Sequence, residues 1–287
     1  LDYRYIKDLL HFGGGITLSR FFNYLTVAGD RVILGNTVSL EFLGIFERLY
    51  KITTLISSQV GSVFDNILFP VFSKEQDNSE STINMYYKAV ETASILGLSI
   101  SIVAPLFSYE LTSVILGSQY LDYHYMLQIL LILPFTRLLT RIGDAILRSH
   151  AMVYQSAVVK FFSAIITLSG LYIASSFEFY WIPFAYFLSS LFTSIASHIL
   201  IGNRIKSSFT KVFFIIIKNI FVIGLMMSPI WIFVIAFKDQ LDISTLFVLK
   251  VIFVMVIGYI LFSRPKILGP GFVEILKPIK NKISKQR

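Results

Sequence analysis

Ionisable side chains lie within and beside one apolar stretch, residues 124–147, at intervals that suit one side of a helix. Arg137, Arg141, Asp144 and Arg148 follow one another at intervals of four, three and four residues, so a helix places all four on one face. An ionised side chain at the centre of a bilayer costs at least about 2.5–3.5 kcal/mol on insertion scales. We therefore expect this face to line a polar cavity. The alternative is a local ion pair of Asp144 with Arg141 or Arg148.

Three further apolar stretches carry polar side chains at similar intervals. Residues 40–69 contain a stripe along one helical face, residues 9–35 contain charges near the middle and one end, and residues 151–175 contain a lysine among hydroxyls. In the first stripe, Glu47 and Lys51 are also spaced to satisfy each other as an ion pair. The members are Glu47, Lys51, Thr54, Ser58, Gly61 or Ser62, and Asp65 in the first stretch, with Arg48 beside them, Arg20, Asp30 and Arg31 in the second, and Ser156, Lys160, Ser163 and Thr167 in the third.

Together these stripes predict a cavity with more positive than negative charge. Guanidinium groups match the oxygens of phosphates and carboxylates, so a cationic cavity predicts an anionic substrate, and an exporter of cationic drugs would need the opposite sign. The sequence indicates no catalytic residue, metal site or cofactor, and it has no cysteine. The predicted substrate-binding side chains are Arg20, Arg48, Lys51, Arg137, Arg141 and Lys160, and the acids that face them are Glu47, Asp65 and Asp144.

The composition places these stripes in a membrane protein. The 287 residues are 55% hydrophobic and 15% charged, whereas a soluble domain carries about a quarter charged residues. Apolar runs of about 20 residues recur along the chain, long enough to cross about 30 Å of hydrocarbon as helices. We predict an all-α integral membrane protein with about eight transmembrane helices, at 9–35, 40–69, 86–116, 124–147, 151–175, 179–201, 211–237 and 244–262.

The positions of Lys and Arg predict the orientation of these helices. One side of the membrane would hold the basic residues of alternate connections and of the segment 264–287, whereas the other side would hold only Lys238. Basic residues favour the cytoplasmic side, so both termini are predicted to be cytoplasmic. Because the basic residues are placed on one side of the predicted spans, the net charge of +8 does not indicate binding to nucleic acid. The basic tail would either bind anionic membrane lipids or be a solvated end. Lys250 has no partner that the sequence identifies.

Three stretches carry a resemblance to a known family. These are DRVILG at 30–35, LGIFERLY at 43–50 and VFDNILFPVFSKEQD at 63–77, with weaker similarity at 143–148. They resemble Wzx-type polysaccharide and O-antigen flippases of the multidrug/oligosaccharidyl-lipid/polysaccharide exporter superfamily. The sequence departs from that pattern after Phe46, where Glu47 and Arg48 stand in place of small residues, which weakens any direct transfer of binding roles to this helix.

The resemblance implies an architecture of two six-helix lobes around a central cavity. Residues 1–205 would form the second lobe, residues 206–263 two additional transmembrane helices, and residues 264–287 a basic cytoplasmic tail. The first lobe would lie upstream, in agreement with the absence of an initiating methionine.

The resemblance also implies a function without enzymatic chemistry. The protein would move an undecaprenyl-diphosphate-linked oligosaccharide across a bacterial inner membrane by alternating access, for O-antigen, capsule or exopolysaccharide synthesis. Polysaccharide polymerase machinery would be a further partner. An ion gradient would drive transport, with Asp30, Glu47, Asp65 and Asp144 as unranked coupling acids. The alternatives are a multidrug exporter of the same superfamily, a polytopic enzyme of polysaccharide assembly, and a channel subunit.

Overall fold

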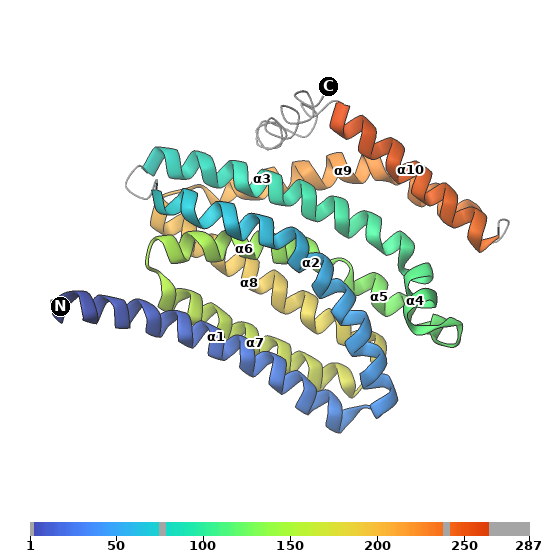
Figure 1. The fold of residues 1–287 in the computed structure, drawn as a ribbon, viewed down its shortest axis with the longest axis horizontal. Coiled ribbons are helices and arrows are strands. Elements are labelled where there is room, and N and C mark those ends of the chain that lie inside the picture. Colours follow the sequence, from blue (N-terminus) through green and yellow to red (C-terminus); the bar gives the residue numbers. More distant parts are fainter. Residues whose placement is uncertain (1–2, 75–78, 238–241, 264–287) are drawn as a thin grey trace. The chain divides into compact units, whose positions relative to one another are not determined.

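A computed structural model describes residues 3–74, 79–237 and 242–263 of the chain. The described residues form helices joined by short connections, and they contain no strand (Figure 1). The predicted all-α class is confirmed. The basic tail 264–287 and the residues Glu75, Gln76 and Asp77 of the third resemblance stretch lie outside the described residues.

The helices follow the predicted order, with two of the predicted spans interrupted. The span at 86–116 is divided by a 3₁₀ segment, and the span at 124–147 is divided at Leu131 and Ile132. The α-helices are α1 (Tyr3–Thr37), α2 (Leu40–Lys74), α3 (Ser79–Val103), α4 (Ser108–Leu116), α5 (His124–Leu130), α6 (Leu133–Ser149), α7 (Val153–Ser175), α8 (Ile182–Ile205), α9 (Phe209–Phe237) and α10 (Ile243–Ser263), with 3₁₀ segments η1 (Ala104–Phe107), η2 (Ser118–Tyr123) and η3 (Phe179–Trp181).

Four described helical segments are long and apolar enough to cross a membrane. They are Ser79–Leu116, Val153–Ser175, Phe179–Ile205 and Phe209–Phe237, and Ile243–Tyr259 is a shorter apolar helix. The chain is therefore a multi-pass helical membrane protein. Helices α1, α2 and α6 are less apolar because they carry the charged stripes found in the sequence.

The helix breaks lie at proline residues, and a serine satisfies the backbone of one of them. Pro105 falls in η1, and Pro134 lies in the first turn of α6. Ser101 of α3 donates a hydrogen bond to the carbonyl of Ile132 at 3.0 Å and accepts one from the N–H of Phe135 at 3.1 Å. This single hydroxyl thus satisfies a carbonyl and an N–H beside the break between α5 and α6, where lipid surroundings leave few other partners.

The described helices form two compact units, and each is treated by itself. The first contains residues 1–83 and 136–209, and the second contains residues 84–135 and 210–287. In the first unit α1 packs along α7, and α7 packs along α8 (Figure 1). Gly15 allows the first contact, because a Cβ added there would overlap Val153 of α7. The domain boundaries predicted at residues 205 and 263 stay predictions.

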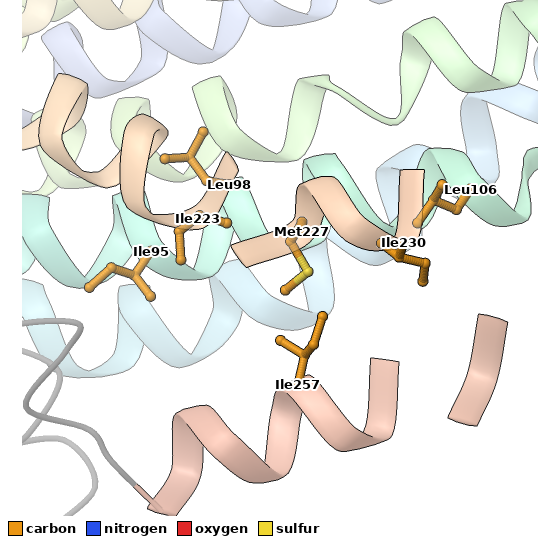
Figure 2. Packing of buried hydrophobic residues seen from close by; sticks show 7 residues of the cluster. All are labelled: Ile95, Leu98, Leu106, Ile223, Met227, Ile230 and Ile257. Carbon is orange, nitrogen blue, oxygen red and sulfur yellow. The ribbon is translucent and has the colours of Figure 1, made fainter. Parts of the chain in front are cut away.

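The second unit has an apolar core built from α3, η1, α9 and α10 (Figure 2). Side chains from each of these elements are almost fully buried there, which leaves the outer faces of α9 and α10 apolar and exposed, as expected of helices that meet lipid. The core residues are Ile95, Leu98, Leu106, Ile223, Met227, Ile230 and Ile257.

The second unit also gives Lys250 of α10 the partner that the sequence did not identify. Its Nζ lies 2.7 Å from Oε1 of Glu110 on α4, and 2.7 Å from the carbonyl oxygen of Leu106 in η1. The side chains of Lys250 and Glu110 are only 4% and 12% exposed. The ammonium group therefore neutralises a buried carboxylate and occupies a carbonyl at the helix break near Pro105.

This pair predicts an asymmetric effect of mutation. Lys250→Met leaves the Glu110 carboxylate buried without its counter-charge, so we expect a loss of stability of about 3–5 kcal/mol, the usual cost of breaking a buried ion pair. Adding Glu110→Gln removes the unpaired charge and should recover part of that loss. Thermal unfolding of the purified protein in detergent measures both, with Lys7→Met, an exposed lysine of α1, as the control. A double variant no more stable than Lys250→Met would contradict the ion-pair explanation.

Candidate functional site

The first unit contains a polar cavity of about 510 Å³. Side chains from α1, α2, α6, α7 and α8 line it, and all of them belong to this unit. The volume lies within the range of about 300–1,000 Å³ that small-molecule sites occupy. It is thus large enough to hold a small molecule or part of a larger ligand.

The cavity carries more positive than negative charge. Five cationic side chains and three carboxylates line it, which leaves a surplus of two positive charges among the described residues. The charged face of α6 and the polar face of α7, each predicted from spacing, both point into it. The cations are Arg20, Arg137, Arg141, Arg148 and Lys160, and the carboxylates are Asp30, Asp65 and Asp144.

Three residues predicted for the site lie elsewhere. Glu47, Arg48 and Lys51 of α2 are exposed and do not line the cavity. Glu47 pairs with Arg31 of α1 at 3.3 Å instead of with Lys51, and both partners are at least half exposed. The spacing within α2 was compatible with a local pair, but the turn between α1 and α2 brings Arg31 within reach of Glu47.

Arg141 is neutralised by Asp65. The guanidinium of Arg141 on α6 forms an ion pair with the carboxylate of Asp65 on α2, and both side chains are about one-third exposed. Gly61, one turn before Asp65, makes room for this contact, because a Cβ added at Gly61 would overlap the guanidinium. The pair joins α2 to α6 across one wall of the cavity.

Asp144 pairs with Lys160 of α7. Lys160 Nζ lies 3.0 Å from Oδ2 of Asp144, and the hydroxyl of Ser156 lies 3.4 Å from Oδ1. Of the two local partners that the sequence offered as the alternative, Arg141 binds Asp65 of α2 instead, and Arg148 Nε donates to the main-chain carbonyl of Asp144 at 3.1 Å. The packing of α6 against α7 thus decides which cation the carboxylate meets.

Arg137 is held by hydroxyls. It donates hydrogen bonds to the Tyr50 hydroxyl at 2.8 Å and to the Thr54 hydroxyl at 3.3 Å, and its guanidinium carbon lies 5.1 Å from the centre of the Tyr50 ring. No described carboxylate forms an ion pair with Arg137, nor with the exposed Arg20. These contacts fix the position of Arg137 but leave its positive charge available to an anion.

Asp30 has a tyrosine partner. The hydroxyl of Tyr186 on α8 donates to Oδ2 of Asp30 at 3.0 Å, and the Tyr186 ring packs against the Tyr50 ring with centroids 4.7 Å apart. Neither tyrosine was among the predicted site residues. Tyr186 precedes the cavity-lining residues Ser190 and Thr193 at intervals of four and three, so the spacing rule used on the other stretches could have found it.

Hydroxyl groups form the wall between α7 and α8. Ser163 and Ser189 lie 2.8 Å apart, Thr167 donates to Ser189 at 2.7 Å, and the Thr193 hydroxyl donates to Ser163 at 2.9 Å. Such small polar side chains let two membrane helices pack closely while they satisfy one another. They also give the cavity wall groups that can donate and accept hydrogen bonds.

The comparison with protein families matches the first part of the chain. Residues 1–125 match the family described as polysaccharide biosynthesis protein. The predicted resemblance to this class of membrane protein is confirmed over those residues. The match includes the cavity residues of α1 and α2, whereas the cavity residues of α6, α7 and α8 follow it in the chain.

Three curated proteins are similar to parts of the chain. Teichuronic acid biosynthesis protein TuaB of Bacillus subtilis is 32% identical over 88 residues, which are 29% of this chain and 18% of TuaB. An uncharacterised membrane protein in the cps region of Klebsiella pneumoniae is 24% identical over 176 residues, 60% of this chain and 36% of that protein. Lipopolysaccharide biosynthesis protein WzxC of Escherichia coli is 21% identical over 128 residues, 45% of this chain and 26% of WzxC.

The matched segments are therefore at most 36% of the length of these relatives. No solved structure matches the chain significantly. The family and two of the three relatives carry descriptions of biosynthesis, namely of polysaccharide, teichuronic acid and lipopolysaccharide.

We predict different coupling energies for the two ion pairs of the cavity, Lys160–Asp144 and Arg141–Asp65. Lys160 and Asp144 are 12% and 27% exposed, whereas Arg141 and Asp65 are 29% and 38% exposed. Water screens the Arg141–Asp65 pair more than the Lys160–Asp144 pair. We therefore expect the double-mutant cycle of Asp144→Asn and Lys160→Gln to show the larger coupling energy, within about 0.5–3 kcal/mol for residues in contact. Chemical unfolding of the single and double variants in detergent measures it. Equal or reversed couplings would show that exposure does not govern these pairs.

Proposed function

We propose that this chain is part of an exporter that moves an anionic lipid-linked oligosaccharide across the bacterial inner membrane for surface polysaccharide synthesis. The observation that carries the proposal is the uncompensated charge of Arg137 and Arg20 in the cavity. Of the five lining cations, Arg141 is neutralised by Asp65 and Lys160 by Asp144. The charges of Arg137 and Arg20 remain at positions where an anion can reach them.

A diphosphate is the group that best suits this surplus. Guanidinium groups bind phosphate oxygens through charge-assisted hydrogen bonds, and an anion that crosses hydrocarbon needs such partners along its path. The neighbouring hydroxyls of α7 and α8 can accept and donate hydrogen bonds to sugar groups. The family and the relatives support a polymer precursor as the ligand, because their descriptions name the synthesis of teichuronic acid, lipopolysaccharide and polysaccharide.

The larger architecture belongs to the same proposal. Residues 1–205 form one six-helix lobe, α9 and α10 are additional helices, and the cargo crosses by alternating access between this lobe and a second one. Both termini of the chain face the cytoplasm, because Lys and Arg are concentrated on that side of the predicted spans. An ion gradient drives the cycle, and membrane lipids surround the exposed apolar faces.

Arg137→Ala tests the proposal. The change removes a guanidinium that no described carboxylate neutralises, so we expect transport to fall at least about tenfold, as for one lost charge-assisted hydrogen bond of about 1.5–3 kcal/mol. The measurement is the transbilayer movement of a fluorescent undecaprenyl-diphosphate oligosaccharide by the purified protein in liposomes. Arg204→Ala, an exposed arginine in the last turn of α8, is the matched control and should transport at the normal rate.

A second substrate distinguishes the exporter classes. The same liposomes are tested with a lipophilic cationic dye, which a multidrug exporter would carry. Transport of the dye that survives or increases in Arg137→Ala, with no movement of the oligosaccharide, would favour the drug exporter. Normal oligosaccharide transport by the Arg137→Ala protein would remove this cavity from the transport path.

A further inference from the structure

The four acids suggested for ion coupling differ in their surroundings. Glu47 pairs with Arg31, Asp65 with Arg141 and Asp144 with Lys160. Asp30 forms no ion pair with any described cation, and its polar partners are the neutral hydroxyl of Tyr186 and the main-chain N–H of Arg31. Asp30 is therefore the one acid of the four whose charge no described cation neutralises through an ion pair.

The surroundings of Asp30 suit a proton better than a metal cation. Asp30 is half-buried at the cavity, and the Tyr186 hydroxyl points its hydrogen at the carboxylate. The charged groups that act on it are Arg31 on its own helix and Glu47 on α2. No group of three or more metal-binding side chains occurs among the described residues, whereas a hard cation takes several oxygen ligands.

A pair of tyrosines connects Asp30 with the free arginine. Tyr186 binds Asp30, its ring packs on Tyr50, and Tyr50 accepts the hydrogen bond of Arg137. Asp30 and Arg137 are also the two charged groups close enough to act electrostatically on the Tyr186 hydroxyl. The tyrosine bridge, Tyr50 and Tyr186, thus places in one cluster a carboxylate and a guanidinium that form no ion pair with any other described residue.

We propose that Asp30 is the proton-accepting group of this site, and that its protonation strengthens the binding of the anionic ligand at Arg137. Ionised Asp30 repels an anion in the cavity and partly offsets Arg137. When Asp30 takes a proton from water, the cavity gains one positive charge, and the ligand then binds more tightly. Thermodynamic linkage requires the reverse as well, so binding the anion promotes proton uptake. The inference rests on the proposed function, because it assumes an anionic ligand.

The test uses farnesyl diphosphate, a soluble diphosphate with an isoprenoid tail, and the purified full-length protein in detergent. Its affinity is measured between about pH 8 and about pH 5 by calorimetry, and proton uptake is measured in weak buffer. We expect affinity to rise on acidification at least about fivefold more in the unmodified protein than in Asp30→Asn, the lower end of typical site coupling. Protonation of the diphosphate itself is common to both proteins and cancels in this comparison.

Three further variants sharpen the result. Asp30→Asn imitates the protonated acid, so it should bind at pH 8 more tightly than the unmodified protein does. Tyr186→Phe removes a hydrogen bond that favours the ionised carboxylate, so the change in affinity should move to higher pH. Asp8→Asn, the same substitution at an exposed position of α1, should behave like the unmodified protein.

The outcomes separate this inference from the proposed function. An unchanged pH dependence in Asp30→Asn, with binding that still requires Arg137, overturns the role of Asp30 alone. Affinity that follows sodium concentration instead of pH also overturns it, because the coupled ion would then not be a proton. If farnesyl diphosphate does not bind the unmodified protein, or binds Arg137→Ala equally well, the proposed function fails and the inference fails with it.

Discussion

The cost of placing charge in hydrocarbon governs the arrangement of this protein. Each ionised side chain inside the bilayer needs water, a counter-charge or a polar partner. The two units meet this requirement differently. In the second unit, the buried Lys250 neutralises Glu110 and holds a carbonyl at a helix break. In the first unit, ion pairs satisfy only some of the cations, and a polar cavity accommodates the rest.

The cavity can exist because its walls are made by close contacts between small or hydroxyl-bearing side chains. Gly15 allows α1 to approach α7, and the hydroxyls of Ser163 and Ser189 bind α7 to α8 without leaving unpaired polar atoms. On the opposite side of α6, apolar residues such as Leu138 and Ile142 are completely buried. One face of α6 is therefore buried, whereas its charged face lines the cavity.

Neutralised and available charges have different roles in such a site. The pairs Arg141–Asp65 and Lys160–Asp144 connect helices and set the shape of the walls. Arg137 is positioned by Tyr50 and Thr54 instead, and neutral hydroxyls fix a guanidinium without cancelling its charge. This difference leaves positive charge in the cavity although three carboxylates line it.

The sequence by itself determined the class of protein, the positions of the helices and the faces that carry charge, because hydropathy and helical spacing are local properties. It placed Arg137 and its three successors on one face, and the polar residues of α7 on another, as the structure has them. Only the tertiary structure decided which charges meet. Glu47 pairs with Arg31 across a turn, and Asp144 pairs with Lys160 of the next helix. Lys250 of α10 pairs with Glu110 of α4, which is far from it in the sequence. Pairing depends on how helices pack and rotate against one another, and no spacing along a single helix contains that information.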